Sequence, residues 1–332
     1  MGRRVWHLCL TMQRLMSSLF GWNSVIMYDN TCPLPQIIDD EYLQEEGEGI
    51  QPMNQPSLLD ALIVSIKVFN IIAEAREVNV TSFAEEMQMS ELTRILQLNE
   101  KLNKIEADLP THLKYESNGR KGTTREEVLM FQAEVVNIRI LYVRLLLLRT
   151  NLLATAREQL IHQDPIILPS QIETTLRNEI ALVCVQSALS ALSILHANLQ
   201  SSSKIISANA LFVTLSAATV LIASSVVPAI GGSLEDPSSA HALGITQAFE
   251  ILDAHESRVE GATETRNKLQ QFLQTAKSAI RYREQVTAQN HNEISETRGS
   301  VQFLAPGEES FFTDIDLSGD LWAPNLDWML YL

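Results

Sequence analysis

The chain has 332 residues, of which 45% are hydrophobic, and a formal net charge of -15 at pH 7. This length is enough for one large core or two smaller ones. The acidity excludes a stand-alone nucleic-acid binder, which would need a basic surface to displace phosphate counterions. The three cysteines, Cys9, Cys32 and Cys184, are widely separated, so the sequence favours a reducing compartment without a disulfide framework.

The first expected element is an amphipathic helix that begins at Arg3 and ends before Gly21. Apolar side chains recur there at three- and four-residue steps, so they share one face of the helix. The members of this face are Val5, Leu8, Met12, Leu15, Met16 and Leu19. Extended chain is expected around Pro33 and Pro35, because a proline disfavours the α conformation in the residue before it. An acidic stretch, residues 39–41, follows.

The order of these parts resembles the middle of the fungal-specific transcription factor domain, the regulatory region of fungal zinc-cluster transcription factors. In that domain a helix that opens with basic residues and a tryptophan precedes a Pro-Leu-Pro and an acidic Asp-Glu-Tyr-Leu segment. The matching residues here are Arg3, Arg4, Trp6, Arg14, Ser17, Gly21, Ile26, Pro33, Leu34, Pro35, Asp39, Asp40, Glu41, Tyr42 and Leu43. The chain departs from the pattern at His7, at Gln13 and at residues 21–23, where Gly-Trp-Asn replaces Gly-Arg-Pro.

Further long helices are expected after an acidic connector at residues 44–56. Apolar periodicity, with Ser57 as an N-cap and breaks at proline and glycine, places them at 58–78, 82–107, 126–160, 171–199, 205–227 and 242–286. The helix at 126–160 carries Arg139, Arg144 and Arg149 among apolar residues, so we expect their stems to be buried and their charged groups to be paired or at the surface. No strand pattern or repeat is visible, which predicts an all-α fold, an irregular bundle of long helices.

Residues 205–234 contain no charged side chain. A membrane span over residues 205–230 is therefore an alternative, and the chain would then be an integral membrane helical protein. The stretch also contains seven serine, threonine and asparagine residues in its first twenty-one positions, and its flanks have no strong basic cluster. We therefore prefer a buried helix of a large helical domain and expect no membrane partner.

The sequence contains no motif that predicts catalysis. GxSxG, GxGxxG, P-loop and HExxH patterns are missing, and the seven histidines show no metal-ligand spacing. We therefore predict that the chain is not an enzyme and has no catalytic, cofactor-binding or metal-binding residues. Cys184 lies on an apolar helix face, which predicts a buried and unreactive thiol.

The family resemblance implies a role in transcription regulation in the nucleus. The family contacts DNA through six cysteines that hold two zinc ions, N-terminal to the regulatory domain, and this chain has none of those cysteines. We therefore expect residues 1–286 to be a regulatory domain that lacks its N-terminal part, with DNA reached only through a zinc cluster outside this chain. The implied partners are coactivator proteins, a second copy of the chain and a small-molecule effector.

The C-terminal segment, residues 307–332, has a distinct composition, and residues 287–306 are expected to link it to the domain. It contains six acidic residues and no lysine or arginine, interleaved with aromatic and aliphatic residues, which is typical of activation segments. We expect five residues to anchor it in a coactivator groove: Phe311, Phe312, Leu317, Trp322 and Trp328. A helix that docks Trp322 and Trp328 onto the chain's own core is the alternative.

Overall fold

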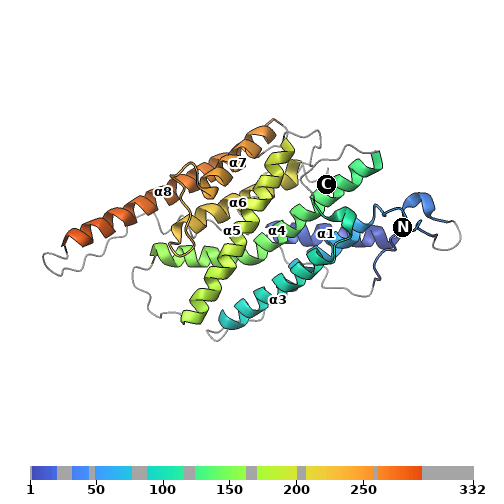
Figure 1. The fold of residues 1–332 in the computed structure, drawn as a ribbon, viewed down its shortest axis with the longest axis horizontal. Helices are drawn as coiled ribbons and strands as arrows, with labels where there is room; N and C mark the ends of the chain where they lie inside the picture. Colours follow the sequence, from blue (N-terminus) through green and yellow to red (C-terminus); the bar gives the residue numbers. More distant parts are fainter. Residues whose placement is uncertain are drawn as a thin grey trace. The chain divides into compact units, whose positions relative to one another are not determined.

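The computed structural model describes residues 2–20, 32–44, 49–76, 88–115, 124–161, 170–199, 207–257 and 261–293. These residues form eight α-helices and two 3-10 helices, and they contain no strand, which confirms the predicted all-α fold for this part of the chain (Figure 1). The α-helices are α1 (Gly2–Phe20), α2 (Asp60–Arg76), α3 (Gln88–Ala107), α4 (Thr124–Ile161), α5 (Gln171–Leu199), α6 (Ser207–Val226), α7 (Ala240–His255) and α8 (Ala262–Glu293). The 3-10 helices are η1 (Asp40–Tyr42) and η3 (Thr111–Leu113).

The chain divides into two compact units. The first contains α1, α2, α3 and the part of α4 up to Leu147, and the second contains the rest of α4 together with α5 to α8. The resemblance assigns residues 1–286 to one regulatory domain, and this range includes residues of both units. α8 continues to Glu293, past the predicted end of the last helix.

Helix α1 buries polar side chains beside part of its predicted apolar face. Val5 and Leu8 of the predicted apolar face are 58% and 48% exposed, and Leu15 is the member that is buried among those whose side chains are described. The other buried side chains of α1 are His7, Leu10, Thr11, Arg14 and Ser17. Most of the described side chains that α1 buries are therefore polar, and the predicted apolar face is only partly covered.

Polar partners in the first unit explain this orientation of α1. Arg4 donates to the carbonyl oxygen of Ile38 at 2.5 Å and pairs with Asp40, and the His7 ring lies 3.2 Å from the carbonyl oxygen of Pro33. Arg14 donates to the side chain of Asn70 in α2. Because buried polar groups are tolerated where they are hydrogen-bonded, specific partners can outweigh the apolar periodicity of a helix.

Asp39 joins the extended segment to the start of α2 and to α4. Its carboxylate accepts hydrogen bonds from the Ser57 hydroxyl at 2.7 Å and from the Leu58 backbone N–H at 2.8 Å, and it pairs with Arg125. Gln51 donates to the same carboxylate at 3.3 Å. Burial alone would raise the pKa of Asp39, but these hydrogen bonds, that of Arg125 foremost, outweigh burial and hold the pKa below its usual value.

The arginines of α4 have the paired environments that the sequence predicts. Arg144 donates to Glu106 at 2.6 Å and to Asn103 at 3.0 Å, both on α3. Arg139 donates to the Ser65 hydroxyl of α2 at 2.5 Å, and burial lowers the pKa of Arg139. Arg149, in the second unit, lies 3.3 Å from the Ser216 hydroxyl of α6. All three groups therefore tie α4 to the helix that each one contacts.

Helix α6 forms the core of the second unit. It packs against α5, α7 and α8, and every side chain from Ala210 to Val227 is buried. Hydroxyl groups in this stretch bond within the helix, as Ser224 does to the carbonyl oxygen of Leu221 at 2.9 Å. These are the features of a core helix, which is the preferred interpretation of the uncharged stretch.

Among the described helices, length and apolar composition would let one, α5, cross a membrane, and 56% of its most apolar window is buried within the protein. The apolar stretch of α6, Ala210–Val226, is shorter than the roughly twenty residues that a spanning helix needs.

The last predicted helix, residues 242–286, is in fact two helices. α7 ends at His255 and α8 begins at Ala262, and Gly261 between them has a φ of 92°. A residue in the left-handed backbone conformation ends a helix, and glycine adopts this conformation without a steric penalty. The two helices pack against each other and against α6, so the prediction of one continuous helix was wrong.

Candidate functional site

A pocket of about 600 Å³ lies in the second unit, between α7, α8 and the loop that joins α6 to α7. This volume is within the range of small-molecule sites. Apolar residues from all three elements form about half of its wall: Leu234, Pro237, Ala242, Ile245, Phe249 and Leu273. Leu234, Ile245 and Leu273 are buried and form the part of the wall that is most shielded from water.

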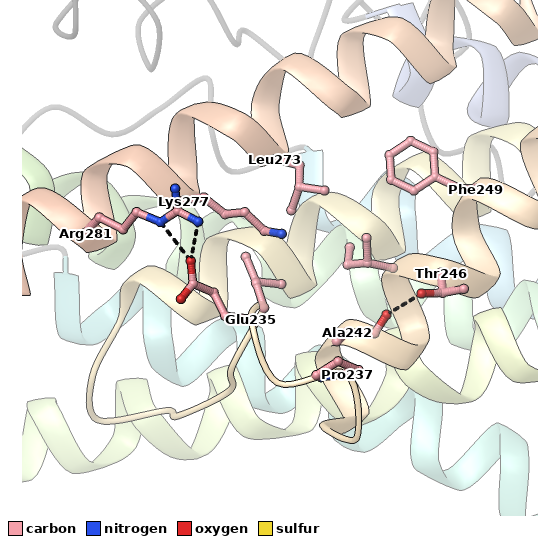
Figure 2. Close-up of a pocket in the computed structure, with 10 residues that line it drawn as sticks. Glu235, Pro237, Ala242, Thr246, Phe249, Leu273, Lys277 and Arg281 are labelled. Carbon is pink, nitrogen blue, oxygen red and sulfur yellow. Dashed lines mark hydrogen bonds and ion pairs between the residues drawn. The ribbon is translucent and has the colours of Figure 1, made fainter.

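Polar groups complete the wall of the pocket. Arg281 of α8 binds Glu235 of the loop through two nitrogens, at 2.8 and 2.7 Å from the same carboxylate oxygen. The Thr246 hydroxyl donates to the carbonyl oxygen of Ala242 at 2.9 Å. Figure 2 shows the Lys277 side chain extending from α8, with its ammonium group between the Glu235–Arg281 pair and the apolar side chains of Leu273 and Phe249 in this view. Among the described residues, Lys277 has no ion-pair partner.

The loop that carries Glu235 is held by short-range hydrogen bonds. The Ser233 hydroxyl accepts from the backbone N–H groups of Glu235 and Asp236, at 3.2 and 3.0 Å. Asp236 accepts from the backbone N–H and the hydroxyl of Ser238, at 2.9 and 2.7 Å, and these bonds lower the pKa of Asp236. Ser239 then caps α7 by accepting from the Ala242 N–H at 3.0 Å. The wall of the pocket is therefore preorganised.

Contacts with α6 and α8 hold the start of the loop. Arg283 of α8 donates to the carbonyl oxygen of Val226 at 2.7 Å, just where α6 ends. Gly232 has a φ of 129° and lies so close to His241 that a Cβ atom there would overlap the imidazole ring. Backbone conformation and the close approach both require glycine at this position.

Replacing Gly232 by alanine is expected to destabilise the second unit by about 2 kcal/mol, because the Cβ atom would meet His241 and the backbone would be strained. Gly231→Ala is the matched control, since Gly231 also has a positive φ but open space around its Cα. We expect a smaller loss for Gly231→Ala, of about 1 kcal/mol. Urea unfolding followed by circular dichroism measures both, and equal losses would show that the contact with His241 is unimportant.

The pair formed by Ser224 and His241 does not have the arrangement of a catalytic dyad. The two side chains are 2.9 Å apart, but the Ser224 hydroxyl donates to the carbonyl oxygen of Leu221 and is fully buried. The ring nitrogen of His241 is therefore the donor to Ser224, and burial lowers the pKa of His241. A nucleophilic serine needs a base as its hydrogen-bond acceptor and access to substrate, so the pair joins α6 to α7.

The residues singled out from the sequence do not gather into one site. Phe311, Phe312, Leu317, Trp322 and Trp328 lie outside the described residues. Cys184 is fully buried in α5, as predicted, and burial raises the pKa of its thiol to about 12 against the opposing charge of Arg149. Within the described ranges, no three histidine, cysteine, aspartate or glutamate side chains are grouped so that they could hold a metal ion.

No pattern in the sequence predicted the pocket. Its residues lie on three elements between positions 234 and 281, and no motif joins them. The prediction of one helix over 242–286 also excluded the pocket, because two halves of one straight helix cannot face each other. The positive φ at Gly261 is the feature that lets the chain reverse, and the glycine is the one signal that could have been used.

We compared the chain with models of protein families, with curated proteins and with solved structures, and none of these comparisons gave a match.

Proposed function

We propose that this chain is a nuclear regulator of transcription, related to the regulatory domain of fungal zinc-cluster transcription factors, and that it responds to a small effector bound in the pocket between α7 and α8. The observation that carries the proposal is the role of the matching residues in the first unit. Arg4, Arg14, Ser17, Pro35 and Asp39 belong to the set on which the resemblance rests, and all of them are buried or hydrogen-bonded between elements.

This observation supports the resemblance because it supplies a physical reason for the pattern. Arg4 and Asp39 hold the extended segment against α1 and α4, and Arg14 joins α1 to α2. Replacing a residue that makes one of these hydrogen bonds would leave its buried or half-buried partner unpaired. Leu34 and Leu43 of the same set are 42% and 40% exposed, so they are not explained by packing within the first unit.

The proposal includes three kinds of partner. DNA would be reached through a zinc cluster on another polypeptide or segment, since this chain has no cysteines with the required spacing. Coactivators would bind the acidic segment at residues 307–332. A second copy would associate through exposed apolar surface, of which Val5, Trp6 and Leu8 on α1 are an example.

The acidic segment is expected to activate transcription on its own. We would fuse residues 307–332 to an unrelated DNA-binding domain and measure reporter output. Activation at least about tenfold above the DNA-binding domain alone is expected, because acidic residues keep the aromatic anchors in water until a coactivator groove takes them up.

The matched control keeps every acid and replaces the five predicted anchors, Phe311, Phe312, Leu317, Trp322 and Trp328, by alanine. This variant should be silent. Silence of the unchanged fusion, combined with loss of folding when the segment is deleted from the full chain, would instead favour the docked helix. A fusion of the full chain tests the regulator itself, and a lack of any effect on the reporter would contradict the proposal.

A further inference from the structure

We infer that the pocket between α7 and α8 binds an amphipathic organic anion, a small carboxylate with a compact apolar body, and that Lys277 is the cation that selects it. The inference rests on the proposed function, because it names the chemical class of the effector that such a regulator would bind. It is argued from the shape of the pocket, its apolar wall and the balance of its charges.

The apolar part of the pocket offers hydrocarbon side chains as contacts for an apolar group of a ligand. Leu234, Ile245 and Leu273 line it and are almost fully shielded from water. The ring of Phe249 is positioned by the guanidinium group of Arg266, 5.4 Å from its centroid, and Arg266 is itself bound to Asp253 at 2.5 Å. An apolar ligand group gains about 25 cal/mol for each Å² of its own surface that the pocket removes from water.

The charges of the pocket select an anion. Glu235 and Arg281 neutralise each other through their two-nitrogen contact, whereas Lys277 has no ion-pair partner among the described residues. One positive charge therefore remains beside the apolar wall, where an anion would face less water than at the open surface. Lys277 would repel a cationic ligand. A neutral ligand would leave the positive charge of Lys277 without a partner.

The position of Lys277 allows one ligand to contact both features. The pocket is lined by Ile245 and Phe249 of α7 opposite Leu273 and Lys277 of α8, and the ammonium group lies on the side of the Glu235–Arg281 pair (Figure 2). A carboxylate at Lys277 can therefore extend its apolar body toward Phe249. The volume of about 600 Å³ accommodates a small molecule.

Isothermal titration calorimetry of the full chain with naphthoate and with naphthamide tests the inference, since the two probes share a ring system and differ in charge. We expect naphthoate to bind at least about tenfold more tightly than naphthamide. Lys277→Met should remove this preference, so that the two probes bind with similar affinity. Lys268→Met is the control on the same helix, because Lys268 pairs with Glu264 and does not line the pocket, and it should bind both probes like the wild type.

A second variant locates the probes. Thr246 lines the pocket and is exposed, so Thr246→Phe should fold and should fill the pocket enough to abolish binding of both probes. No binding of naphthoate, equal binding of the two probes, or binding unaffected by both Lys277→Met and Thr246→Phe would overturn the inference. Failure of naphthoate to bind while the reporter fusions remain active would overturn the ligand assignment alone, whereas selective binding with inactive fusions would contradict the transcription role alone.

Discussion

Replacing Asp39 by alanine is expected to destabilise the first unit by about 3–5 kcal/mol, because it removes the acceptor of a buried ion pair and of several hydrogen bonds together. Ser57 and Leu58 would lose an acceptor of their hydrogen bonds, and Arg125 would lose one of its two carboxylate partners. The start of α2 and the extended segment before it would be released from α4. Urea unfolding followed by circular dichroism should show the loss as a lower midpoint for the transition that includes the first unit.

Asp40 provides the control for this experiment. It neighbours Asp39 and pairs with Arg4, but its side chain is 69% exposed. Exposed ion pairs contribute about 0–1 kcal/mol, so Asp40→Ala should change stability little. Equal effects of the two substitutions would contradict the role given to Asp39.

The effect of Asp39 should also depend on pH, and the direction follows from its pKa. The pKa is lower in the folded protein than the ordinary value of 3.8, so the carboxylate stabilises the fold above that pH. This contribution is lost as the pH falls through the folded-state pKa. The difference in stability between the wild type and Asp39→Asn should therefore shrink in acid.

Replacing Glu134 by glutamine is expected to stabilise the protein by about 3 kcal/mol in mildly alkaline solution and to have little effect in mild acid. Glu134 lies on α4, is 6% exposed, and one of its oxygens has no hydrogen-bond partner among the described residues. Burial raises the pKa of Glu134 from 4.5 to about 7. Burial and the nearby Glu134 carboxylate also raise the pKa of Tyr115.

The sign of the pH dependence follows from this shift. Below pH 4.5 the carboxyl is protonated in both the folded and the unfolded chain, so burial has no ionic cost. Between pH 4.5 and about 7 the unfolded chain ionises first, and the free energy of unfolding decreases as the pH rises. Above that range the cost is constant. Glutamine cannot ionise, so the variant avoids this cost.

Urea unfolding of the wild type and Glu134→Gln at about pH 5 and about pH 9 measures the effect. Glu127→Gln is the matched control, because Glu127 lies on the same helix and is exposed. It should show no difference between the two conditions. The stability difference between Glu134→Gln and the wild type could instead be the same at both pH values. That result would show that ionisation of the buried Glu134 carboxyl does not destabilise the fold.

Local sequence was enough to locate most of the described helices. Apolar periodicity and chain breakers located the cores of α1 to α6, and the predicted ends of the helix at 171–199 agree with those of α5. The uncharged stretch in α6 and Cys184 in α5 are buried as the composition predicts. These features depend on local sequence, because strongly apolar segments have few alternatives to burial.

Tertiary structure alone decided which face of α1 is buried and where the candidate site lies. The polar face of α1 turns inward because Ile38, Pro33 and Asn70 supply hydrogen-bond partners that are distant in sequence. The pocket forms because Gly261 lets α8 reverse and bring Lys277 opposite α7. Apolar periodicity describes the residues along one helix. The buried face of α1 and the position of the pocket depend on contacts with other elements, and those contacts stabilise the chain only once it is folded.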